Sequence, residues 1–316
     1  MTLKIGIIGA ARVATYAMIA PARVNPRTIV AAVAARDPDR ARAYAAEHDI
    51  GCVHASYAAL VADPGVDLVY VATPPAFHLA HARLAIAAGK PVLVEKPFTM
   101  DVVEAETLLV EAAAAGVPIF EAMHSRHRRV WGLIAQLLPQ IGALQQLDAV
   151  FDIVVGTADD EFRWDAALGG GALMDLGVYP LAWVRAVAGE PLTATSAAMR
   201  RERGADAAFR ATLAMPAGVT ATVAADMTAA RRASLVITGS NGTIRLDNAM
   251  SQAAGQVLHL ETAKGKVQHT LDGPSTFEAQ LAAIVATLCD GVPFPLAAAD
   301  PLASMRAIAM VRAAAG

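Results

Sequence analysis

The sequence predicts an α/β protein in which a doubly wound parallel sheet precedes an α+β domain with a large, mostly antiparallel sheet. In the first part, short continuous apolar runs alternate with helical stretches, which is typical of parallel strands buried on both faces. In the second part, strand-like stretches follow one another with turn signals between them. We expect a first domain over 1–122 and a second over 123–316, and the last helices can pack back on the first domain.

Five apolar runs of the first domain are predicted strands, and three alanine-rich stretches between them are predicted helices. The strands are Lys4–Gly9, Thr28–Ala35, Asp67–Ala72, Pro91–Glu95 and Val117–Glu121. The helices are Pro38–His48, Ala76–Ala88 and Met100–Ala115. Because right-handed crossovers join parallel strands, this alternation implies an open sheet with helices on both faces.

The second domain is predicted to consist mainly of consecutive strands, with a few helices. Its predicted strands are Leu147–Val155, Thr193–Arg201, Ala207–Met215, Val219–Asp226, Ala233–Thr238, Thr243–Asp247, Val257–Glu261 and Val267–Thr270. Its predicted helices are Arg129–Leu138, Ala172–Val187, Phe277–Cys289 and Pro301–Ala315. Consecutive strands of this kind favour antiparallel pairing.

The composition is unusually apolar, with 55% hydrophobic and 17% charged residues. Soluble domains carry about 25% charged residues, so the chain either spans a membrane or buries much of itself. The longest charge-free run that we find, Val130–Leu147, is interrupted by glutamines, a proline and a glycine. A spanning helix needs about 18 to 20 apolar residues, so we expect no membrane segment.

Charge and cysteine content exclude further classes. The net charge of −3 argues against a nucleic-acid binder, which usually has a basic face. Cys52 and Cys289 cannot form a disulfide framework, and we expect both to be buried, small apolar residues. The N-terminus leads directly into a strand without a signal peptide, so we expect a cytoplasmic protein.

A glycine-containing turn follows the first predicted strand. The dinucleotide-binding fingerprint is GxGxxG or GxGxxA at this place, between a strand and a helix. Gly9 and Ala14 fit its first and third positions, whereas Ala11 replaces the middle glycine and would crowd a pyrophosphate slightly. A plain packing turn is the alternative, but the strand–turn–helix context favours the dinucleotide site.

The end of the second predicted strand reports on the cofactor. An acidic residue there binds the ribose of NAD, and an arginine can bind the 2′-phosphate of NADP. Arg36 comes first in this sequence, and Asp37 is the predicted N-cap of the following helix. The pattern favours NADP over NAD, with a solvated Arg36 as the alternative.

Lys96 is the first candidate for chemistry. It lies in Glu95–Pro97 at the carboxyl end of a predicted parallel strand, where open α/β sheets bind their ligands. Lysine changes its protonation state readily when it is removed from water, which suits a catalytic group. A surface lysine between a strand and a helix is an equally good interpretation of the local sequence.

A second candidate segment is Gly169–Tyr179, which begins with three glycines that let a backbone approach a ligand. Asp175 and Tyr179 are four residues apart and share one face of a continuous helix. Pro180 disfavours a helix at Tyr179 unless the helix is kinked. A helix-end aspartate and a packed tyrosine are the alternative.

Together these segments make the chain similar to the Gfo/Idh/MocA oxidoreductases, named after glucose–fructose oxidoreductase and inositol dehydrogenase. Tyr179 resembles the branch with dimeric dihydrodiol dehydrogenases and aldose dehydrogenases, since the inositol dehydrogenase branch has histidine there. The matching stretches follow the family's order: Ile5–Ala14, Val33–Ala41, Thr73–His78, Ala88–Pro97, Gly169–Pro180 and Ile237–Asn248.

The resemblance implies an NAD(P)-dependent enzyme that transfers hydride between nicotinamide and a carbinol or carbonyl of a sugar, cyclitol or dihydrodiol. It implies Lys96, Asp175 and Tyr179 as the catalytic group. Tyr179 would accept the carbinol proton, and Lys96 would favour its ionised form or exchange roles with it. Asp175 would orient a substrate hydroxyl or Lys96. The implied cofactor contacts are Gly9, Ala11, Arg12, Val13, Arg36, Thr73, Pro74, His78, Glu95 and Lys96.

Other parts of the sequence leave the substrate open. The segment after the fifth strand borders the substrate in the family, and His124 lies where this chain departs from the family's pattern, so the resemblance implies His124 as a candidate substrate contact. Arg163, upstream of the glycines, is a second candidate. Arg163 as a surface charge is an equal alternative. His78 and His81 have chelating spacing, but we expect no metal site.

Two competing functions remain on sequence grounds. A non-catalytic dinucleotide sensor would bind NADP without turnover, and a dinucleotide-dependent glycoside hydrolase would show net hydrolysis. The retained Lys96 and Tyr179 favour catalysis. The apolar strands of the second domain exceed what one helix layer covers. Since family members pair through this sheet, the resemblance implies a homo-oligomer, expected to be a dimer.

Overall fold

A computed structural model describes residues 2–158, 161–250 and 256–316 of the chain. The chain forms two units. The first, which we call the N-terminal unit, comprises Met1–His124 and Phe277–Leu302, and the second, the C-terminal unit, comprises Ser125–Thr276 and Ala303–Gly316. The chain therefore leaves the N-terminal unit after His124 and re-enters it at Phe277.

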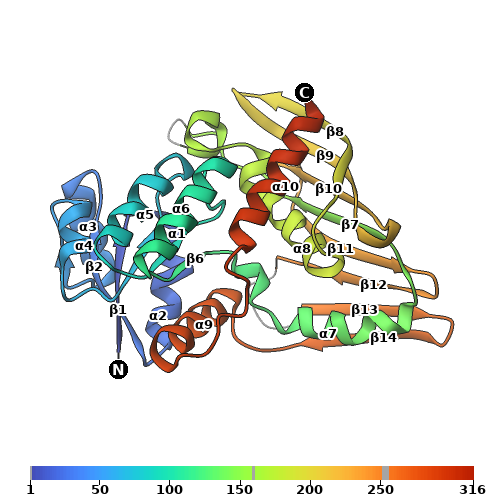
Figure 1. The fold of residues 1–316 in the computed structure, drawn as a ribbon, viewed down its shortest axis with the longest axis horizontal. Helices are drawn as coiled ribbons and strands as arrows, with labels where there is room; N and C mark the ends of the chain where they lie inside the picture. The colour runs from blue at the N-terminus through green and yellow to red at the C-terminus, as the bar shows by residue number, and fades with distance from the viewer. Residues whose placement is uncertain (1, 159–160, 251–255) are drawn as a thin grey trace. The chain divides into compact units, whose positions relative to one another are not determined.

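The N-terminal unit is built on a six-stranded parallel sheet with the strand order β3-β2-β1-β4-β5-β6 (Figure 1). This order confirms the predicted doubly wound sheet, whose direction of winding reverses between β1 and β4. The strands are β1 (Leu3–Ile8), β2 (Thr28–Ala34), β3 (Cys52–Val53), β4 (Leu68–Val71), β5 (Val92–Val94) and β6 (Ile119–Glu121).

Helices connect these strands, and one helix from the end of the chain joins them. They are α1 (Arg12–Ala14), α2 (Ala20–Val24), α3 (Pro38–His48), α4 (Tyr57–Ala62), α5 (His78–Ala87), α6 (Val102–Ala115) and α9 (Thr276–Asp290). On α9, Phe277, Leu281 and Ile284 are buried in the same core as Ile5 and Ile7 of β1. The sequence missed β3 and α4, because a two-residue strand and a six-residue helix are too short to show a period.

Burial on both faces of this sheet explains part of the apolar composition. Ile7 and Ile8 are adjacent on β1 and point to opposite faces, yet neither is exposed. Leu68, Tyr70 and Leu93 on the neighbouring strands are also fully buried. The parallel sheet therefore needs apolar residues at nearly every position of its central strands, as the sequence predicted.

The C-terminal unit contains an eight-stranded sheet with the order β14-β13-β12-β11-β7-β10-β9-β8. Neighbouring strands are antiparallel except β7 and β10, which confirms the predicted sheet. The strands are β7 (Leu144–Asp152), β8 (Thr193–Glu202), β9 (Ala205–Ala214), β10 (Thr220–Asp226), β11 (Arg232–Gly239), β12 (Gly242–Asp247), β13 (Gln256–Thr262) and β14 (Gly265–Leu271).

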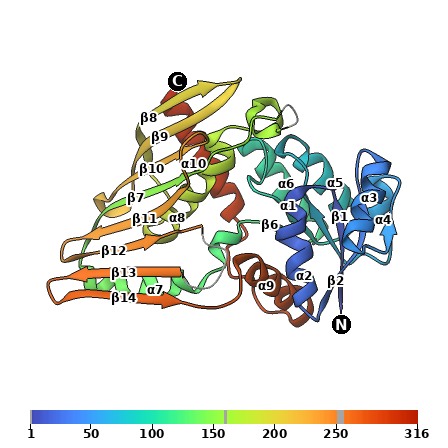
Figure 2. The ribbon, with the colours of Figure 1, turned by 180° about the vertical axis from the view of Figure 1, so that it is seen from behind.

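Helices cover one face of this sheet: α7 (Arg129–Leu137), α8 (Val178–Ala188) and most of α10 (Asp300–Ala315). Figures 1 and 2 show these helices in front of the strands from one side and behind them from the other. Arg185 on α8 is held by two hydrogen bonds to Glu190 and donates to Ser304 on α10 at 2.8 Å. Among the described residues, the opposite face of the sheet carries no helix.

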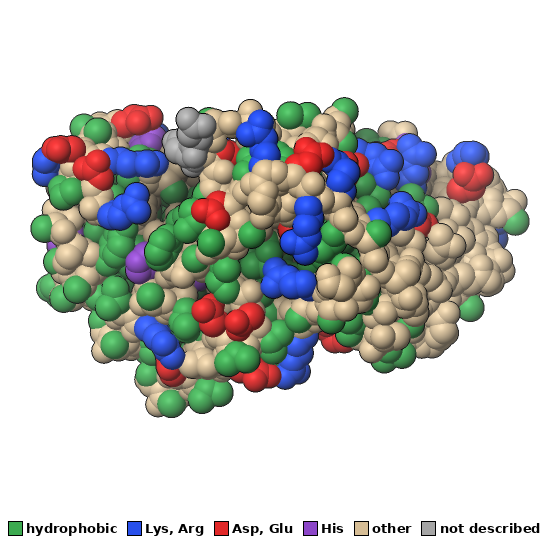
Figure 3. Space-filling view, turned by 90° about the horizontal axis from the view of Figure 1, so that it is seen from above, with side chains coloured by type: hydrophobic (Ala, Val, Ile, Leu, Met, Phe, Trp, Pro, Cys, Tyr) green, Lys and Arg blue, Asp and Glu red, His purple; other side chains and the backbone are tan. Residues whose placement is uncertain are grey.

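Residues Ala166–Ala188 form a helical stretch long and apolar enough to cross a membrane by length and composition. Most of it, 83% of the window, is buried inside the fold, as in a core helix. It is the only such stretch in the described part of the chain. On the surface, Figure 3 shows Lys and Arg mixed with Asp and Glu on the face that it displays.

A buried histidine joins the loops that follow β4 and β5. The ring of His78 is 0% exposed, and its Nε2 lies 2.7 Å from the carbonyl oxygen of Thr73. Its Nδ1 lies 3.0 Å from the carbonyl oxygen of Pro97 and 3.3 Å from that of Phe98. A neutral ring carries one hydrogen, so it donates to one of the two loops at a time. Burial outweighs these carbonyls and lowers the pKa of His78 to about 4.

This pKa predicts a loss of stability in mild acid. An unfolded histidine ionises at about pH 6.5, so between pH 7.5 and pH 5 the unfolded chain takes up a proton that folded His78 does not. The free energy of unfolding should therefore fall by about 2 kcal/mol from this residue over that range. In urea unfolding followed by circular dichroism, His78→Gln should flatten the pH dependence by that amount. His259→Gln, which changes an exposed ring, is the control. If the free energy of unfolding of His78→Gln depended on pH as strongly as that of the unaltered chain, the lowered pKa of His78 would be contradicted.

Candidate active site

The turn after β1 has the geometry of a dinucleotide site. Gly9 has a φ of +105°, and a Cβ there would lie 3.1 Å from the carbonyl oxygen of Ala72, so only glycine fits without strain. The N–H of Ala11 donates to the carbonyl of Gly9 at 2.9 Å, and a helical run begins at Arg12. Ala11 has an extended backbone, which accommodates its methyl group. Ala14 is fully buried, as close helix–strand packing requires.

The end of β2 presents a cation rather than a carboxylate. Arg36 is exposed. The carboxylate of Asp37 accepts hydrogen bonds from the backbone N–H groups of Asp39 at 2.9 Å and Arg40 at 3.3 Å, which confirms the predicted N-cap of α3. Because capping occupies Asp37, the group at this strand end that best suits a ligand phosphate is the guanidinium of Arg36.

The loop after β4 contains the predicted contacts Thr73 and Pro74. The hydroxyl of Thr73 lies 3.0 Å from Nδ1 of His81, and burial lowers the pKa of His81. The ring nitrogens of His78 face main-chain carbonyls instead. The two histidines therefore contact different groups: His78 contacts main-chain carbonyls, and His81 contacts the hydroxyl of Thr73.

Glu95 organises the segment that carries Lys96. Its carboxylate is buried, accepts a 2.5 Å hydrogen bond from the hydroxyl of Tyr70, and accepts another from the backbone N–H of Lys96 at 3.1 Å. Burial, and then the neighbouring Glu95, raise the pKa of Tyr70 well above its ordinary value, so Tyr70 stays a donor. The Lys96–Pro97 peptide bond is cis, and Lys96 is half-buried. Lys96 thus lies just after the carboxyl end of β5, and the hydrogen bond to Glu95 holds its backbone in place.

The glycines at the start of the segment Gly169–Tyr179 pack against other parts of the protein. A Cβ on Gly170 would lie 2.6 Å from the carbonyl oxygens of Phe162 and Arg163. The N–H of Gly171 donates to the carbonyl of Arg163 at 2.9 Å. Our sequence interpretation assigned these glycines to ligand approach, whereas the structure shows them against the turn of 162–164. This contact fixes the position of Arg163 relative to the following helix.

Arg163 is a partnered side chain. It forms two hydrogen bonds with Glu161, at 2.8 and 2.5 Å, and its Nη1 lies 3.9 Å from Oδ2 of Asp175. The exposed fractions of the side chains are 18% for Arg163, 11% for Glu161 and 14% for Asp175. The cluster thus pairs one guanidinium with two carboxylates, and water still reaches all three side chains. The surface-charge alternative for Arg163 is therefore wrong.

Tyr179 and Asp175 lie on one helical run despite Pro180. Residues Leu173–Gly177 form a π-helix that continues directly into α8. The wider π turn contains the carbonyl of Leu176, with which the proline ring would clash in a regular α-helix, so no break is needed. The ring of Tyr179 is 6% exposed and packs edge-on against Phe151, with centroids 5.5 Å apart.

Some residues of the site escaped the sequence analysis. Asp206, on β9, accepts a hydrogen bond from the N–H of Leu173 at 2.7 Å and so supports the start of the π-helix. Burial raises the pKa of Asp206. Glu161 and Tyr70 were missed as well. These residues are distant in sequence from the groups they hold, so no local pattern marks them.

His124 lies at the boundary of the N-terminal unit. It is 3% exposed, and its ring packs on that of Phe277 with centroids 4.1 Å apart. The predicted substrate contact of His124 stays a prediction, as do the other role assignments.

Comparison with family models identifies the family of the chain. The family model of the oxidoreductase family with an NAD-binding Rossmann fold (GFO/IDH/MocA) matches residues 3–123. The GFO/IDH/MocA C-terminal domain matches residues 138–245. Together these matches cover both units and most of the chain.

Individual proteins that are similar over most of the chain support the same family. A dTDP-3,4-didehydro-2,6-dideoxy-α-D-glucose 3-reductase of Streptomyces violaceoruber is 35% identical over 89% of this chain and 84% of its own length. A trans-1,2-dihydrobenzene-1,2-diol dehydrogenase of Sus scrofa is 31% identical over 78% of this chain and 74% of its own. A 3-ketoreductase from Actinomadura kijaniata, solved in complex with NADP and TDP-benzene, superposes with a TM-score of 0.93 at 29% identity, covering 100% of this chain and 98% of that one. The chain belongs to the GFO/IDH/MocA family of NAD(P)-dependent oxidoreductases, as its motifs predicted.

Proposed function

We propose that this chain transfers hydride between NADP(H) and a carbinol or carbonyl carbon of a sugar, cyclitol or dihydrodiol. The observation that carries the proposal is the position of Lys96 directly after the carboxyl end of β5, one strand from the point where the winding of the sheet reverses. Ligands of open α/β sheets bind at that point. A dinucleotide sensor has no need of a lysine held there by Glu95 and Tyr70.

The residues of the N-terminal unit fit NADP. The turn at Gly9 brings backbone close to the place of the pyrophosphate, and the helical run from Arg12 supplies N–H groups that favour negative charge. Arg36 would hold the 2′-phosphate, and Thr73, Pro74, Glu95 and Lys96 would border the nicotinamide half. When bound, the cofactor supplies a hydride acceptor or donor at C4 of the nicotinamide.

The proposed proton chemistry belongs to the chain's own residues. Tyr179 accepts the carbinol proton in oxidation or returns it in reduction, with its ring fixed by Phe151. A tyrosine ordinarily ionises at about pH 10, so a neighbouring ammonium is needed to favour its anion. Lys96 fills that role in our proposal and also polarises the reacting oxygen.

Asp175 is proposed to orient the substrate. Its carboxylate accepts hydrogen bonds, and Nη1 of Arg163 lies 3.9 Å from its Oδ2. Adjacent hydroxyls of sugars and dihydrodiols are donors that suit such a carboxylate. Relatives named as reductases of dTDP-linked deoxysugars and as dihydrodiol dehydrogenases support this class of substrate. Arg163 and His124 are the further residues that we assign to the substrate.

We also propose a homodimer that forms through the open face of the large sheet. The row Asp148, Thr212, Thr222 and Val236 runs across four neighbouring strands of that face, and each of these residues is half-buried. Mostly small side chains in a flat row suit the packing of one sheet against another. A cytoplasmic location is proposed because both cysteines are free thiols, and cell fractionation would test it.

The proposed chemistry predicts the effects of two substitutions. Lys96→Met and Tyr179→Phe should each lower kcat by about 100-fold or more while NADP still binds, because each removes a group that acts on the reacting oxygen. The measurement is nicotinamide absorbance with NADP and a panel of aldoses, cyclitols and dihydrodiols, and with NADPH and dTDP-linked ketosugars. Lys264→Met, on an exposed turn, is the control.

The same panel separates the competing functions. Turnover that survives both substitutions would contradict the assigned roles. Cofactor binding without turnover on any member of the panel would indicate a sensor. Hydrolysis of glycosides without a net change of the cofactor would indicate a hydrolase.

Arg36 predicts the choice of cofactor. Arg36→Ala should raise the KM for NADP about 10- to 100-fold, because a charged hydrogen bond of about 1.5 to 3 kcal/mol to the 2′-phosphate is lost. The KM for NAD should change little. Arg42→Ala, an exposed arginine of α3 paired with Asp39, should leave both values unchanged. Equal effects of Arg36→Ala on the two cofactors would refute a phosphate contact.

The dimer predicts a mass of twice 32.7 kDa in light scattering at micromolar concentration. Val236→Lys should shift the chain to the monomer, because it places a charge in the middle of the open face. Lys266→Glu, on the outermost strand β14, is a control that should not. A monomer for the unaltered chain would refute the dimer.

A further inference from the structure

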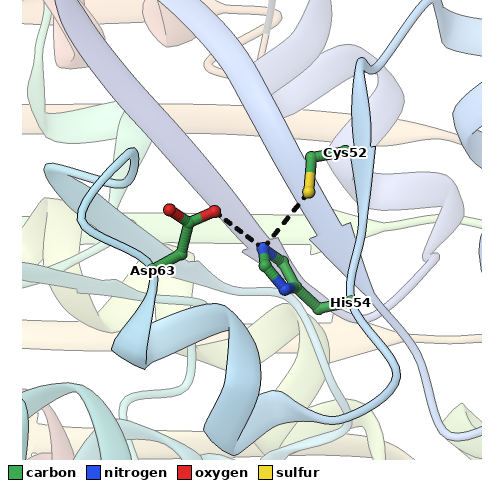
Figure 4. Close-up of side chains that lie close together, drawn as sticks. All are labelled: Cys52, His54 and Asp63. Carbon is green, nitrogen blue, oxygen red and sulfur yellow. Dashed lines mark hydrogen bonds and ion pairs between the residues drawn. The ribbon is translucent and has the colours of Figure 1, made fainter.

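Three side chains of kinds that bind transition metals meet at the edge of the parallel sheet. Cys52 is the first residue of β3, His54 directly follows that strand, and Asp63 ends α4. Their ligand atoms all lie within 4.8 Å of one another. Figure 4 shows the thiol and the carboxylate pointing toward the imidazole from two sides. The expectation that both cysteines are buried is wrong, since Cys52 and Cys289 are each half-buried.

The three groups converge on a single atom. Sγ of Cys52 lies 3.4 Å from Nε2 of His54, and Oδ2 of Asp63 lies 2.9 Å from the same Nε2. In a nucleophile–histidine–carboxylate relay the two partners bind opposite ring nitrogens. One hydrogen on Nε2 cannot make a good bond to both partners. The arrangement is therefore no proton relay, and its three ligand atoms lie close enough together to share one cation.

Two of the three distances between the ligand atoms come close to those of a tetrahedral metal site, and the third, between Sγ of Cys52 and the carboxylate of Asp63, lies within 4.8 Å. Zn²⁺ bonds of about 2.3 Å to sulfur and about 2.0 Å to nitrogen or oxygen place ligand atoms about 3.3 to 3.6 Å apart. The sulfur–nitrogen distance already fits. The nitrogen–oxygen distance must open by about 0.4 Å, which a small rotation of either side chain provides.

Neighbouring contacts hold the ligands in place. Oδ1 of Asp63 accepts the N–H of Gly65 at 2.7 Å, which leaves Oδ2 directed at the histidine. That bond, and then the bond to His54, lower the pKa of Asp63. The backbone N–H of His54 donates to the carbonyl of Val33 on β2. The exposed fractions of the side chains, 17% for His54 and 24% for Asp63, leave room for water as a fourth ligand.

The local charges also suit a divalent cation. A thiolate and a carboxylate together balance an ion of charge +2. The ammonium of Lys90 donates to the carbonyl oxygens of Asp63 and Val66 and adds one positive charge near Asp63, which the two anionic ligands must outweigh. A thiolate with an imidazole and a carboxylate selects borderline ions such as Zn²⁺ or Co²⁺ over Mg²⁺ or Ca²⁺.

We propose that Cys52, His54 and Asp63 bind one Zn²⁺, or another borderline divalent ion, with water as the fourth ligand. The Sγ–H bond of Cys52 breaks, an Sγ–metal bond forms, and one proton goes to solvent. The imidazole stays neutral, since its hydrogen moves from Nε2 to Nδ1 when Nε2 binds the metal. No oxidant or reductant takes part. The ion ties β3 to the end of α4, and the site is independent of the oxidoreductase function.

The test is a Co²⁺ titration of the tag-free, metal-stripped full chain. One Co²⁺ per chain should give a thiolate-to-cobalt charge-transfer band in the near ultraviolet together with the visible bands of tetrahedral cobalt, and Zn²⁺ should displace it. Cys52→Ser should abolish the charge-transfer band. His54→Gln and Asp63→Asn should each weaken binding about tenfold or more. Cys289→Ser, which removes the other cysteine, should change neither.

Thermal unfolding gives a readout that does not depend on the colour of the metal. Zn²⁺ should raise the midpoint of the unaltered chain and of Cys289→Ser, and it should leave that of Cys52→Ser unchanged. His259→Gln, at a second histidine–aspartate pair with Asp247, serves as the matched control and should keep the full shift. The absence of a charge-transfer band in the unaltered chain, or a band that persists in Cys52→Ser, would overturn the proposal.

Discussion

The buried imidazole of His78 is the constraint on which the cofactor side of the site depends. It lies between the carbonyls of Thr73 and Pro97, and thus between the loop after β4 and the loop after β5. The loop after β5 carries Lys96, whose backbone is held a second time by Glu95. A fully buried polar ring costs stability unless it is hydrogen-bonded. Whichever carbonyl accepts the ring hydrogen, its loop is held to the buried imidazole.

Two prolines account for the π-helical segments that lie after the turn at Gly9 and before Tyr179. Pro21 and Pro180 each lie two or three residues after a π-helical segment, Thr15–Ile19 in one case and Leu173–Gly177 in the other. A proline lacks the N–H that would bond four residues back, and its ring clashes with that carbonyl. The wider turn removes the clash and lets the helix continue. At the second position this keeps Asp175 and Tyr179 on one helical run.

The apolar composition has two structural uses. In the N-terminal unit the central strands are buried on both faces, so nearly every position is apolar. In the C-terminal unit the burial alternates along β9, β10 and β11, with one face under the helices and the other carrying half-buried residues. The first use follows from the fold of one chain, and the second is where we propose that a second copy packs.

The sequence by itself determined the order of the strands and helices apart from β3 and α4, the turn at Gly9, the cap at Asp37 and the positions of Lys96, Asp175 and Tyr179 in the chain. These features rest on local patterns, because periodicity, turn chemistry and motifs lie within a few residues. The tertiary structure alone decided what holds them: Tyr70 on Glu95, Glu161 on Arg163, Asp206 at the π-helix, and the convergence of Cys52 with Asp63 on His54. These partners come from different elements, and no spacing along a chain records which elements folding brings together.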